Sequence, residues 1–328
     1  MEVIVGIESI QKPLTNPVLT IGNFDGVHRG HQALFQRVKD WAARLQGQSV
    51  VMTFNPHPLE VFRPGNGPAF ITTHERKLEL IAQAGIEVTI VVPFDKTFAQ
   101  TPATDFVKDL LVDRIGVRAI VVGHDYRFGK GREGDIAFLR RMAERYAFDV
   151  DAVSGIDVEG TIVSSTLIRQ CIHGGDLREA CRLLGRPYEI KGKVVKGRNR
   201  GARLLGFPTA NIDMANHAAP KRGVYAVQVE IDGRLYGGAA NLGYNPTFGD
   251  TALSLEVHIL DFNDDVYGKS IMVRFIDRLR DERKFSGLEE LIQQISRDVN
   301  LARGILLSCT PASPPAKGVD SNLASRAE

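Results

Sequence analysis

Cysteine is scarce in this sequence. The 328 residues include only Cys171, Cys181 and Cys309, and no two of them form a CxxC pair. This usage excludes a disulfide framework and a cysteine metal cage, and it is typical of proteins in a reducing compartment. We therefore expect a cytoplasmic protein.

Long apolar runs and an excess of charge of one sign are also lacking. No stretch approaches 18 apolar residues, and residues 1–6 have neither the basic start nor the apolar core of a signal peptide. The formal net charge is +2, which argues against a general nucleic-acid binder or a tether to an acidic surface. We expect no membrane and no nucleic-acid partner, and nothing in the sequence indicates the oligomeric state.

The length and the alternation of patterns in the first half predict a parallel α/β domain. The chain is 43% hydrophobic and longer than a usual single domain. Apolar runs at 18–21, 49–54, 87–92, 118–122 and 148–153 alternate with amphipathic patterns at 31–46, 73–84, 103–115 and 134–146. Apolar strands joined by helices predict a Rossmann-like parallel sheet that is covered on both faces.

The pattern changes near residue 187. Alternating apolar and polar residues at 188–196, 223–231, 235–241, 253–260 and 270–276 predict a compact antiparallel barrel. An apolar stripe predicts a closing helix over 287–303. We therefore expect one domain over 1–186, a second over 187–307 and a disordered Pro/Ala/Ser-rich tail over 308–328.

The most informative stretch of the first domain is residues 18–31, which end in Gly22-Asn23-Phe24-Asp25-Gly26-Val27-His28-Arg29-Gly30-His31. A strand leads into a glycine-rich turn and then into a helix whose start carries two histidines. Free backbone N–H groups and the helix dipole favour an anion at such a position. No HExxH glutamate, no Gly-Lys-Ser/Thr ending and no GxGxxG order is present, so we expect a nucleotide site that is neither a zinc site nor a P-loop.

Polar clusters follow the predicted strands at 23–25, 55–58 and 123–131, and a Ser-Ser-Thr turn at 164–166 enters another helix. Each cluster alone is compatible with ordinary turn or capping chemistry. Ligands of parallel sheets bind beyond the carboxyl ends of the strands. Four clusters at one edge therefore indicate a binding site.

The second domain has its own candidate site in the basic, glycine-rich stretch 191–211. Such a stretch is compatible with a solvated face or an RNA patch, and also with a loop that binds a polyphosphate. Thr209 and Asn211 offer neutral oxygens that suit Mg²⁺ bound to a nucleotide. Glu256 lies among apolar neighbours on a predicted strand, where burial favours a general base, although an exposed strand residue fits the pattern too.

Taken together, these motifs resemble the bacterial bifunctional riboflavin kinase/FMN adenylyltransferases, also called FAD synthetases. The similarity covers about residues 3–305. The stretch 22–31 resembles the HxGH signature of nucleotidyltransferases, which other adenylyl- and cytidylyltransferases share. Its combination with residues 123–129, 164–169 and 206–211 is specific to this family. Tyr126, where the family more often has Phe, is the one departure.

The resemblance implies roles for particular residues. His28 and His31 would hold the ATP phosphates during adenylyl transfer, and Glu256 would deprotonate the riboflavin 5′-hydroxyl. Thr209 and Asn211 would bind Mg²⁺. Nucleotide contacts are expected from Gly22, Asn23, Phe24, Asp25, Gly30, Asp125, Arg127, Ser165, Thr166, Arg169, Gly197 and Gly201. Flavin contacts are expected from Phe128, Asn241, Gly243, Thr247 and Arg280.

The expected function is therefore synthesis of FMN and then FAD from riboflavin and two ATP, with Mg²⁺ as cofactor. The expected partners are the small molecules riboflavin, FMN and ATP. An alternative is a flavin-binding regulatory or storage protein that has lost the chemistry, but the phosphate-handling residues argue against it. An RNA-binding protein is a third interpretation, disfavoured by the near-neutral charge and by the lack of interleaved aromatics in the basic stretch.

Overall fold

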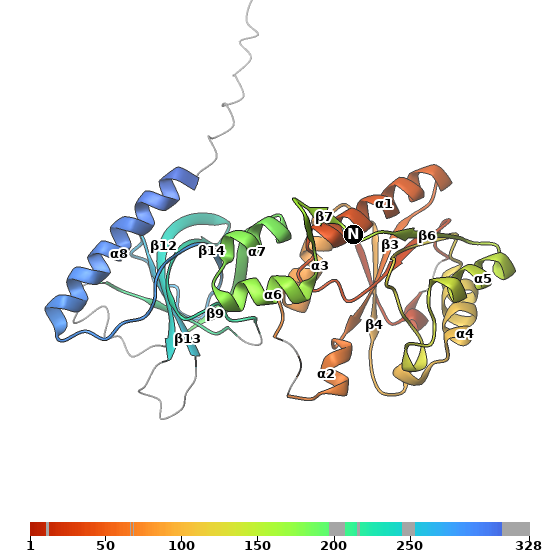
Figure 1. Ribbon diagram of the computed structural model, residues 1–328, viewed down its shortest axis with the longest axis horizontal. Helices are drawn as coiled ribbons and strands as arrows, with labels where there is room; N and C mark the ends of the chain where they lie inside the picture. Colours follow the sequence, from red (N-terminus) through yellow and green to blue (C-terminus); the bar gives the residue numbers. More distant parts are fainter. Residues whose placement is uncertain are drawn as a thin grey trace, which may run out of the picture.

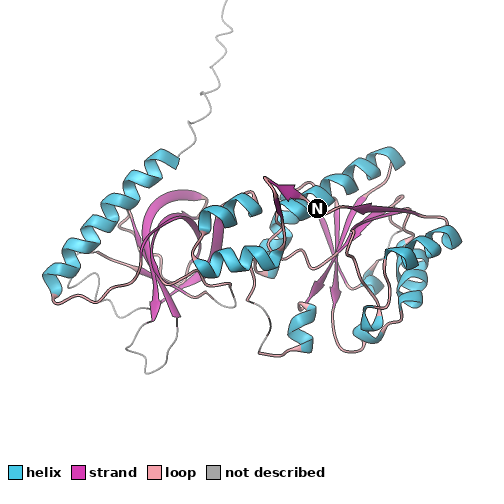
Figure 2. Cartoon of the chain, viewed as in Figure 1, coloured by secondary structure: helices cyan, strands magenta, loops and turns pink. Residues whose placement is uncertain are grey.

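A computed structural model describes residues 1–10, 13–65, 67, 69–196, 207–214, 217–244 and 253–309 of the chain. Two regions lie side by side along the long axis of the molecule, with the helices α6 (Ser165–Gly174) and α7 (Leu177–Leu184) between them (Figure 1). The N-terminal region contains a parallel sheet and the C-terminal region contains a barrel (Figure 2).

The sheet has six parallel strands in the order β1-β4-β3-β2-β5-β6. Their bounds are β1 (Glu2–Val5), β2 (Val18–Ile21), β3 (Ser49–Asn55), β4 (Val88–Pro93), β5 (Ala119–Gly123) and β6 (Asp149–Val153). The chain reverses its winding direction between β2 and β5, which are adjacent in the sheet but far apart in sequence. In such sheets the crevice at the reversal is the usual place for a ligand.

Helices cover both faces of the sheet because its strands are apolar on both sides. One face, with Val18 of β2, packs against α1 (Arg29–Leu45) and α3 (His74–Gln83). The other, with Leu19, packs against the π-helix η3 (Phe106–Ile115) and α5 (Ile136–Tyr146). Shorter elements are η1 (Ile7–Ser9), α2 (Pro58–Phe62), η2 (Phe98–Gln100), α4 (Ala103–Asp105), η4 (Lys130–Arg132), β7 (Asp157–Val158) and β8 (Thr161–Ile162).

The C-terminal region is a closed six-stranded barrel in the order β10-β13-β12-β11-β14-β9, with antiparallel neighbours. Its strands are β9 (Tyr188–Val195), β10 (Ala210–Ile212), β11 (Gly223–Ile231), β12 (Arg234–Tyr244), β13 (Leu253–Ile259) and β14 (Ser270–Arg280). The long helix α8 (Leu288–Cys309) packs against β11, β12 and β14.

Helices α6 and α7 share a hydrophobic core with the barrel. Ile168, Ile172, Leu177 and Leu183 are at most 2% exposed and belong to one cluster with the barrel's interior side chains. The proposed boundary at 186/187 therefore falls directly after two helices that pack on the second domain.

The predicted fold class is confirmed, with a parallel sheet followed by an antiparallel barrel and a C-terminal helix. The sequence analysis missed β1, a four-residue edge strand with only Ile4 buried, which is too short for a periodic signal. The single helix predicted over 103–115 is wrong in form, because a short α4 continues into the π-helix η3. The tail predicted over 308–328 lies outside the described residues from 310 onward.

Candidate active sites

A pocket of about 680 Å³ opens at the carboxyl ends of the sheet strands. It brings together polar clusters that the sequence placed at separate strand ends. The predicted residues in its wall are Gly22, Asn23, Phe24, Asp25, His31, Asp125, Arg127, Phe128, Ser165 and Arg169. Ten predicted residues from three stretches of the sequence, 22–31, 125–128 and 165–169, therefore line one cavity.

His28 and His31 form a stacked pair at the start of α1. Their ring centroids lie 3.5 Å apart, and Nδ1 of His28, the N-cap residue, accepts from the His31 backbone N–H at 3.4 Å. Gly30 leaves the room for this stack, since a Cβ there would lie 3.1 Å from the His28 ring. Phe24 packs edge-on against the His31 ring at 5.2 Å. The pair is therefore fixed by packing before any ligand binds.

Burial keeps both imidazoles neutral in the free protein. It lowers the pKa of His28 to about 3, with further lowering by the charges of Arg186 and Arg169. Burial and the charges of Lys77 and Arg186 also hold the pKa of His31 well below its usual value. Neutral imidazoles at a helix N-terminus, with cations nearby, suit an incoming anion.

Lys77 of α3 supplies one of these cations, and the sequence analysis missed it. Its Nζ donates to the carbonyls of Asn23 and Phe54 and to Oγ1 of Thr53, so it ties the ends of β2 and β3 together. Burial lowers its pKa to about 8. A lysine inside an amphipathic helix gives no signal in a single sequence that distinguishes it from a surface lysine.

The carboxylate of Asp25 is already hydrogen-bonded to other groups of the protein. It is 4% exposed and accepts from the backbone N–H groups of Ile71 and Thr72 and from Nη2 of Arg169, the last at 2.6 Å. Ser165 Oγ donates to the Asp25 carbonyl at 3.0 Å. Asp25 thus joins the strand end, the segment before α3 and the start of α6.

Aromatic side chains form the other side of this pocket. Phe128 is 7% exposed and stacks on Tyr126 with 5.5 Å between centroids and an 18° angle. Further rings in the wall are those of Phe54, Phe62, Phe94, Phe98 and Phe106. The sequence analysis missed these because they lie on four separate segments. Such a wall suits a flat heterocycle.

Some predicted residues lie outside the wall of this pocket. His28 lies behind His31, and Gly30 acts through the space it leaves. Thr166 is exposed on the first turn of α6 and is not part of the lining. His57, which follows β3, does line the pocket, and burial lowers its pKa to about 4.

In the barrel, three adjacent strands align a second set of polar side chains. Glu256 on β13 pairs in register with Asn211 on β10 and with Asn241 on β12. Paired residues of antiparallel strands point to the same face, with Cβ atoms about 5 Å apart. Burial raises the pKa of Glu256, as a general base near neutral pH requires.

Two cavities meet beside this row. One, of about 500 Å³, is lined by Thr209, Asn211 and the segment 263–267. The other, of about 340 Å³, is lined by Thr209, Asn241, Glu256 and Arg280. Thr209 belongs to both, so it lies where a ligand in one cavity meets a ligand in the other.

Arg280 lines this second cavity, and a carboxylate of α8 holds its side chain in place. Its Nε and Nη2 both donate to the carboxylate of Asp298, at 3.0 and 2.7 Å, and its guanidinium lies 5.8 Å from the centroid of the Phe285 ring. Gly243 lies under Glu282, where an added Cβ would collide with the carboxylate. The predicted residues Gly197, Gly201 and Thr247 lie outside the described part of the chain.

Over the described ranges, no group of three or more His, Cys, Asp or Glu side chains could hold a metal ion. Thr209 and Asn211 carry neutral oxygens, which fit a divalent ion brought by a nucleotide better than a resident one. No helix in the described part of the chain is long and apolar enough to cross a membrane.

Comparison with known proteins gives matches over both regions. A family model for FAD synthetase matches residues 10–167, and one for riboflavin kinase matches residues 184–306. The bifunctional riboflavin kinase/FMN adenylyltransferase of Escherichia coli (strain K12) is 41% identical over 95% of this chain and 100% of its own length. The enzyme of that name from Pseudomonas fluorescens is 39% identical over 93% of this chain and 98% of its own.

A solved structure is similar over nearly the same span. A crystal structure of a Streptococcus pneumoniae protein described as a macrolide-efflux protein superposes with a TM-score of 0.83 at 33% identity, and it covers 92% of this chain and 99% of its own. Its fold is therefore the fold found here. With both regions matched and the identity held over the full length of the curated relatives, the chain belongs to the family of bifunctional riboflavin kinase/FMN adenylyltransferases.

Proposed function

We propose that the chain makes FAD in two steps at the two pockets described above. Riboflavin is phosphorylated by ATP in the barrel, and the resulting FMN is adenylylated by a second ATP at the sheet edge. The observation that carries this division is the contrast in polar groups. The barrel pocket holds a half-buried carboxylate with a raised pKa, and the sheet pocket holds histidines and cations.

At the sheet pocket, a phosphate oxygen of FMN attacks the α-phosphorus of ATP, the α–β P–O bond breaks and pyrophosphate leaves. A phosphate monoester is already anionic at neutral pH, so no residue must remove a proton. The protein's task is to stabilise negative charge. His28, His31 and the N–H groups at the start of α1 do so, with Lys77 and Arg169 nearby.

The remaining residues of this pocket are assigned by their position. Gly22, Asn23 and Phe24 border the nucleotide, and Asp125, Arg127 and Phe128 border the flavin mononucleotide, whose ring would lie on the aromatic wall. Asp25 acts through Arg169 and Ser165 and not by direct contact, because its oxygens are already occupied.

At the barrel pocket, the riboflavin 5′-hydroxyl attacks the γ-phosphorus of ATP, the bond from that phosphorus to the β–γ bridging oxygen breaks and ADP leaves. The hydroxyl proton goes to a carboxylate oxygen of Glu256. A raised pKa makes Glu256 a better proton acceptor at the moment of attack. Asn241 and Arg280 border the flavin on the 340 Å³ side, and the nucleotide occupies the 500 Å³ side.

Thr209 and Asn211 would hold Mg²⁺ together with the ATP phosphates at the junction of the two cavities. Two neutral oxygen donors suit an ion that keeps most of its water. Bound there, Mg²⁺ would neutralise charge on the phosphates of ATP.

The test of this function is product analysis on the purified full chain. With riboflavin, ATP and Mg²⁺, chromatography should resolve FMN and then FAD. With FMN in place of riboflavin, FAD should form without a lag. A protein that binds flavin but yields neither product would restore the storage or regulatory alternative, which the comparisons do not support.

The same proposal includes the setting of the enzyme. We assign residues 1–186 to adenylyl transfer and 187–307 to phosphorylation, and we expect the cytoplasm as its location from the sparse cysteines. Its partners are small molecules, with neither nucleic acid nor membrane among them.

A further inference from the structure

Arg186 lies between α7 and β9, in the short connection that joins the two regions of the molecule. Its Nη2 donates to the carbonyl of Gly26 at 2.7 Å and its Nη1 to the carbonyl of Val27 at 3.2 Å. These two residues directly precede His28. A side chain from the interdomain connection therefore holds the backbone that carries the histidine pair.

The turn it holds has an unusual conformation. Gly26 and Val27 have φ values of +86° and +38°. A positive φ is costly for a β-branched residue and persists only where its surroundings impose it. Gln32 gives partial support, since its Nε2 donates to the Val27 carbonyl and to the Leu184 carbonyl at the end of α7. The Gly26 carbonyl has Arg186 as its hydrogen-bond partner.

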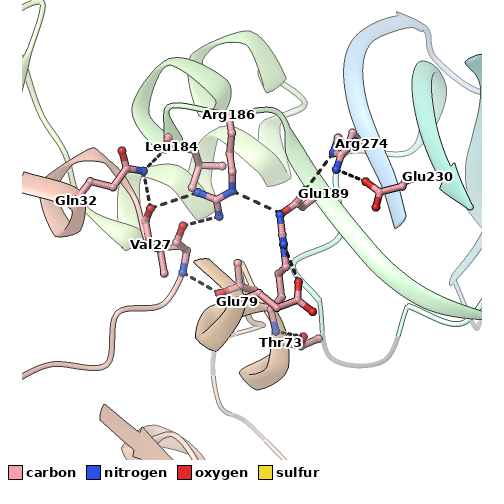
Figure 3. Close-up of polar contacts among 12 residues, drawn as sticks. Val27, Gln32, Thr73, Glu79, Leu184, Arg186, Glu189, Glu230 and Arg274 are labelled. Atoms are coloured by element: carbon pink, nitrogen blue, oxygen red, sulfur yellow. Dashed lines mark hydrogen bonds and ion pairs between the residues drawn. The ribbon is translucent and has the colours of Figure 1, made fainter. Parts of the chain in front are cut away.

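Arg186 is itself held by the barrel. Figure 3 shows it between Val27 and Glu189, whose Oε1 lies 3.6 Å from the Arg186 Nε. Glu189 is on β9 with its side chain 4% exposed, and it also pairs with Arg76 of α3 at 2.6 Å and with Arg274 of β14 at 3.5 Å. One buried carboxylate is thus paired with three arginines. Of these three, only Arg186 also donates hydrogen bonds to the turn before His28.

We propose that Arg186 is a positioning residue for adenylyl transfer: it fixes the Gly26–Val27 turn and thereby His28, and Glu189 of the barrel holds it in place. This inference rests on the function proposed above for the sheet pocket. Its consequence is that part of the transferase site is supported by the kinase domain.

The mechanism is geometric. Without the guanidinium, Val27 can relax toward negative φ, which rotates the peptide units on either side and moves the N-cap residue of α1. Displacements of about 1 Å at a reacting group cost about 10²-fold in rate. Because His28 acts on charge that develops during transfer, the loss should fall on kcat more than on KM.

The test compares two variants of the full chain, Arg186→Met and Arg274→Met. Both remove a cation that contacts Glu189, and the two arginine side chains are similarly exposed, at 17% and 24%. Of the two, Arg186 alone contacts the Gly26–Val27 turn. Steady-state kcat and KM are measured for FMN adenylylation and for riboflavin phosphorylation, with a thermal melt of each protein.

We expect Arg186→Met to lower kcat for FAD formation about 10- to 100-fold, with KM for ATP and FMN changed by less than about threefold and riboflavin phosphorylation unchanged. Arg274→Met should leave both activities near wild type. Arg186→Lys, which keeps a cation and can reach one carbonyl, should fall between wild type and Arg186→Met.

Full adenylyl-transfer rates in Arg186→Met would overturn the proposal, as would an equal loss in Arg274→Met, which would assign the effect to the stability of the whole cluster. If Arg186→Met loses both activities through unfolding, Arg186→Lys decides: a folded, kinase-active Arg186→Lys with an undiminished adenylyl-transfer rate contradicts positioning. Wild-type protein that makes no FAD contradicts the proposed function instead, so the two failures are distinct.

Discussion

The sheet pocket and the barrel pocket both handle ATP, yet they use opposite kinds of side chain. The sheet pocket carries histidines whose pKa values are lowered by burial, next to Lys77 and Arg169, and its one buried carboxylate is bound to Arg169 and backbone N–H groups. The barrel pocket carries Glu256, whose pKa is raised by burial.

The difference follows from the two nucleophiles. An alcohol must lose a proton as it attacks phosphorus, so the site needs a base. A phosphate monoester arrives with its charge already present, so the site needs only preorganised positive potential. The side chains of each pocket therefore identify the nucleophile, although both reactions transfer part of ATP.

The largest expected effect that separates the pockets is that of Glu256→Gln. Glutamine keeps the size of the side chain and removes its ability to accept a proton. Riboflavin phosphorylation should fall about 10²- to 10⁴-fold, the usual contribution of a positioned base. FAD formation from supplied FMN should stay at the wild-type rate, because its nucleophile needs no base. Turnover with riboflavin and with FMN on one preparation measures both.

Parallel loss of both activities in Glu256→Gln would indicate unfolding, which circular dichroism would reveal. An intact phosphorylation rate would make Glu256 a structural strand residue and remove the contrast between the pockets.

The reciprocal variant is His28→Ala. It removes one preorganised partner of the transferring phosphate and should lower FAD formation about 10²- to 10³-fold. Riboflavin phosphorylation should not change, since Glu256 and Thr209 lie in the barrel. Accumulation of FMN without FAD, followed by chromatography, is the expected readout. Normal FAD output would mean that the stacked histidines serve only to cap α1.

The sequence predicted the lining of the sheet pocket better than the residues that hold this lining in place. Glycines and histidines at 22–31 have a compact pattern, and parallel strands bring their ends together, so ten lining residues could be named in advance. Lys77 and Arg186 could not, because each reaches the site from a segment distant in sequence and neither belongs to a motif.

The site in the barrel was harder to predict from the sequence, because strand register decides which of its polar side chains are neighbours. That Asn211, Glu256 and Asn241 are cross-strand neighbours depends on how three strands pair, which alternation alone leaves open. The bidentate contact between Arg280 and Asp298 joins a strand to a helix and has no local signal either.

A third test concerns where the two regions divide. A fragment over 187–307 should phosphorylate riboflavin and make no FAD, but it lacks α6 and α7. A fragment that starts at 165 keeps Ile168, Ile172, Leu177 and Leu183 in the barrel core. Since burying each such side chain contributes about 1.5–3 kcal/mol, the longer fragment should be more stable by several kcal/mol. Urea unfolding compares the two fragments, and equal stability would assign both helices to the transferase domain.

The last test distinguishes the two regions by pH. Burial lowers the pKa of four histidines in the sheet region, namely His28, His31, His57 and His74. Below pH 6.5 these histidines bind protons in the unfolded chain but stay neutral in the folded protein. The free energy of unfolding therefore falls as pH falls. Each histidine contributes a slope of at most about 1.4 kcal/mol per pH unit.

In the barrel region the balance is different. His217, with a pKa lowered by burial, gives the same sign as the sheet histidines. Glu256 gives the opposite sign, because its raised pKa lets the folded state bind a proton before the unfolded state does, which stabilises the fold as pH falls toward 4.5. Between pH 7 and 5 the sheet region should therefore lose stability more steeply than the barrel.

Hydrogen exchange followed by mass spectrometry on peptides from α1 and β13, corrected for the intrinsic exchange rate, measures the two slopes. His57→Gln should flatten the slope of the sheet region and leave that of the barrel unchanged. Equal slopes in the wild type would mean that the two pockets do not differ in how they hold protons.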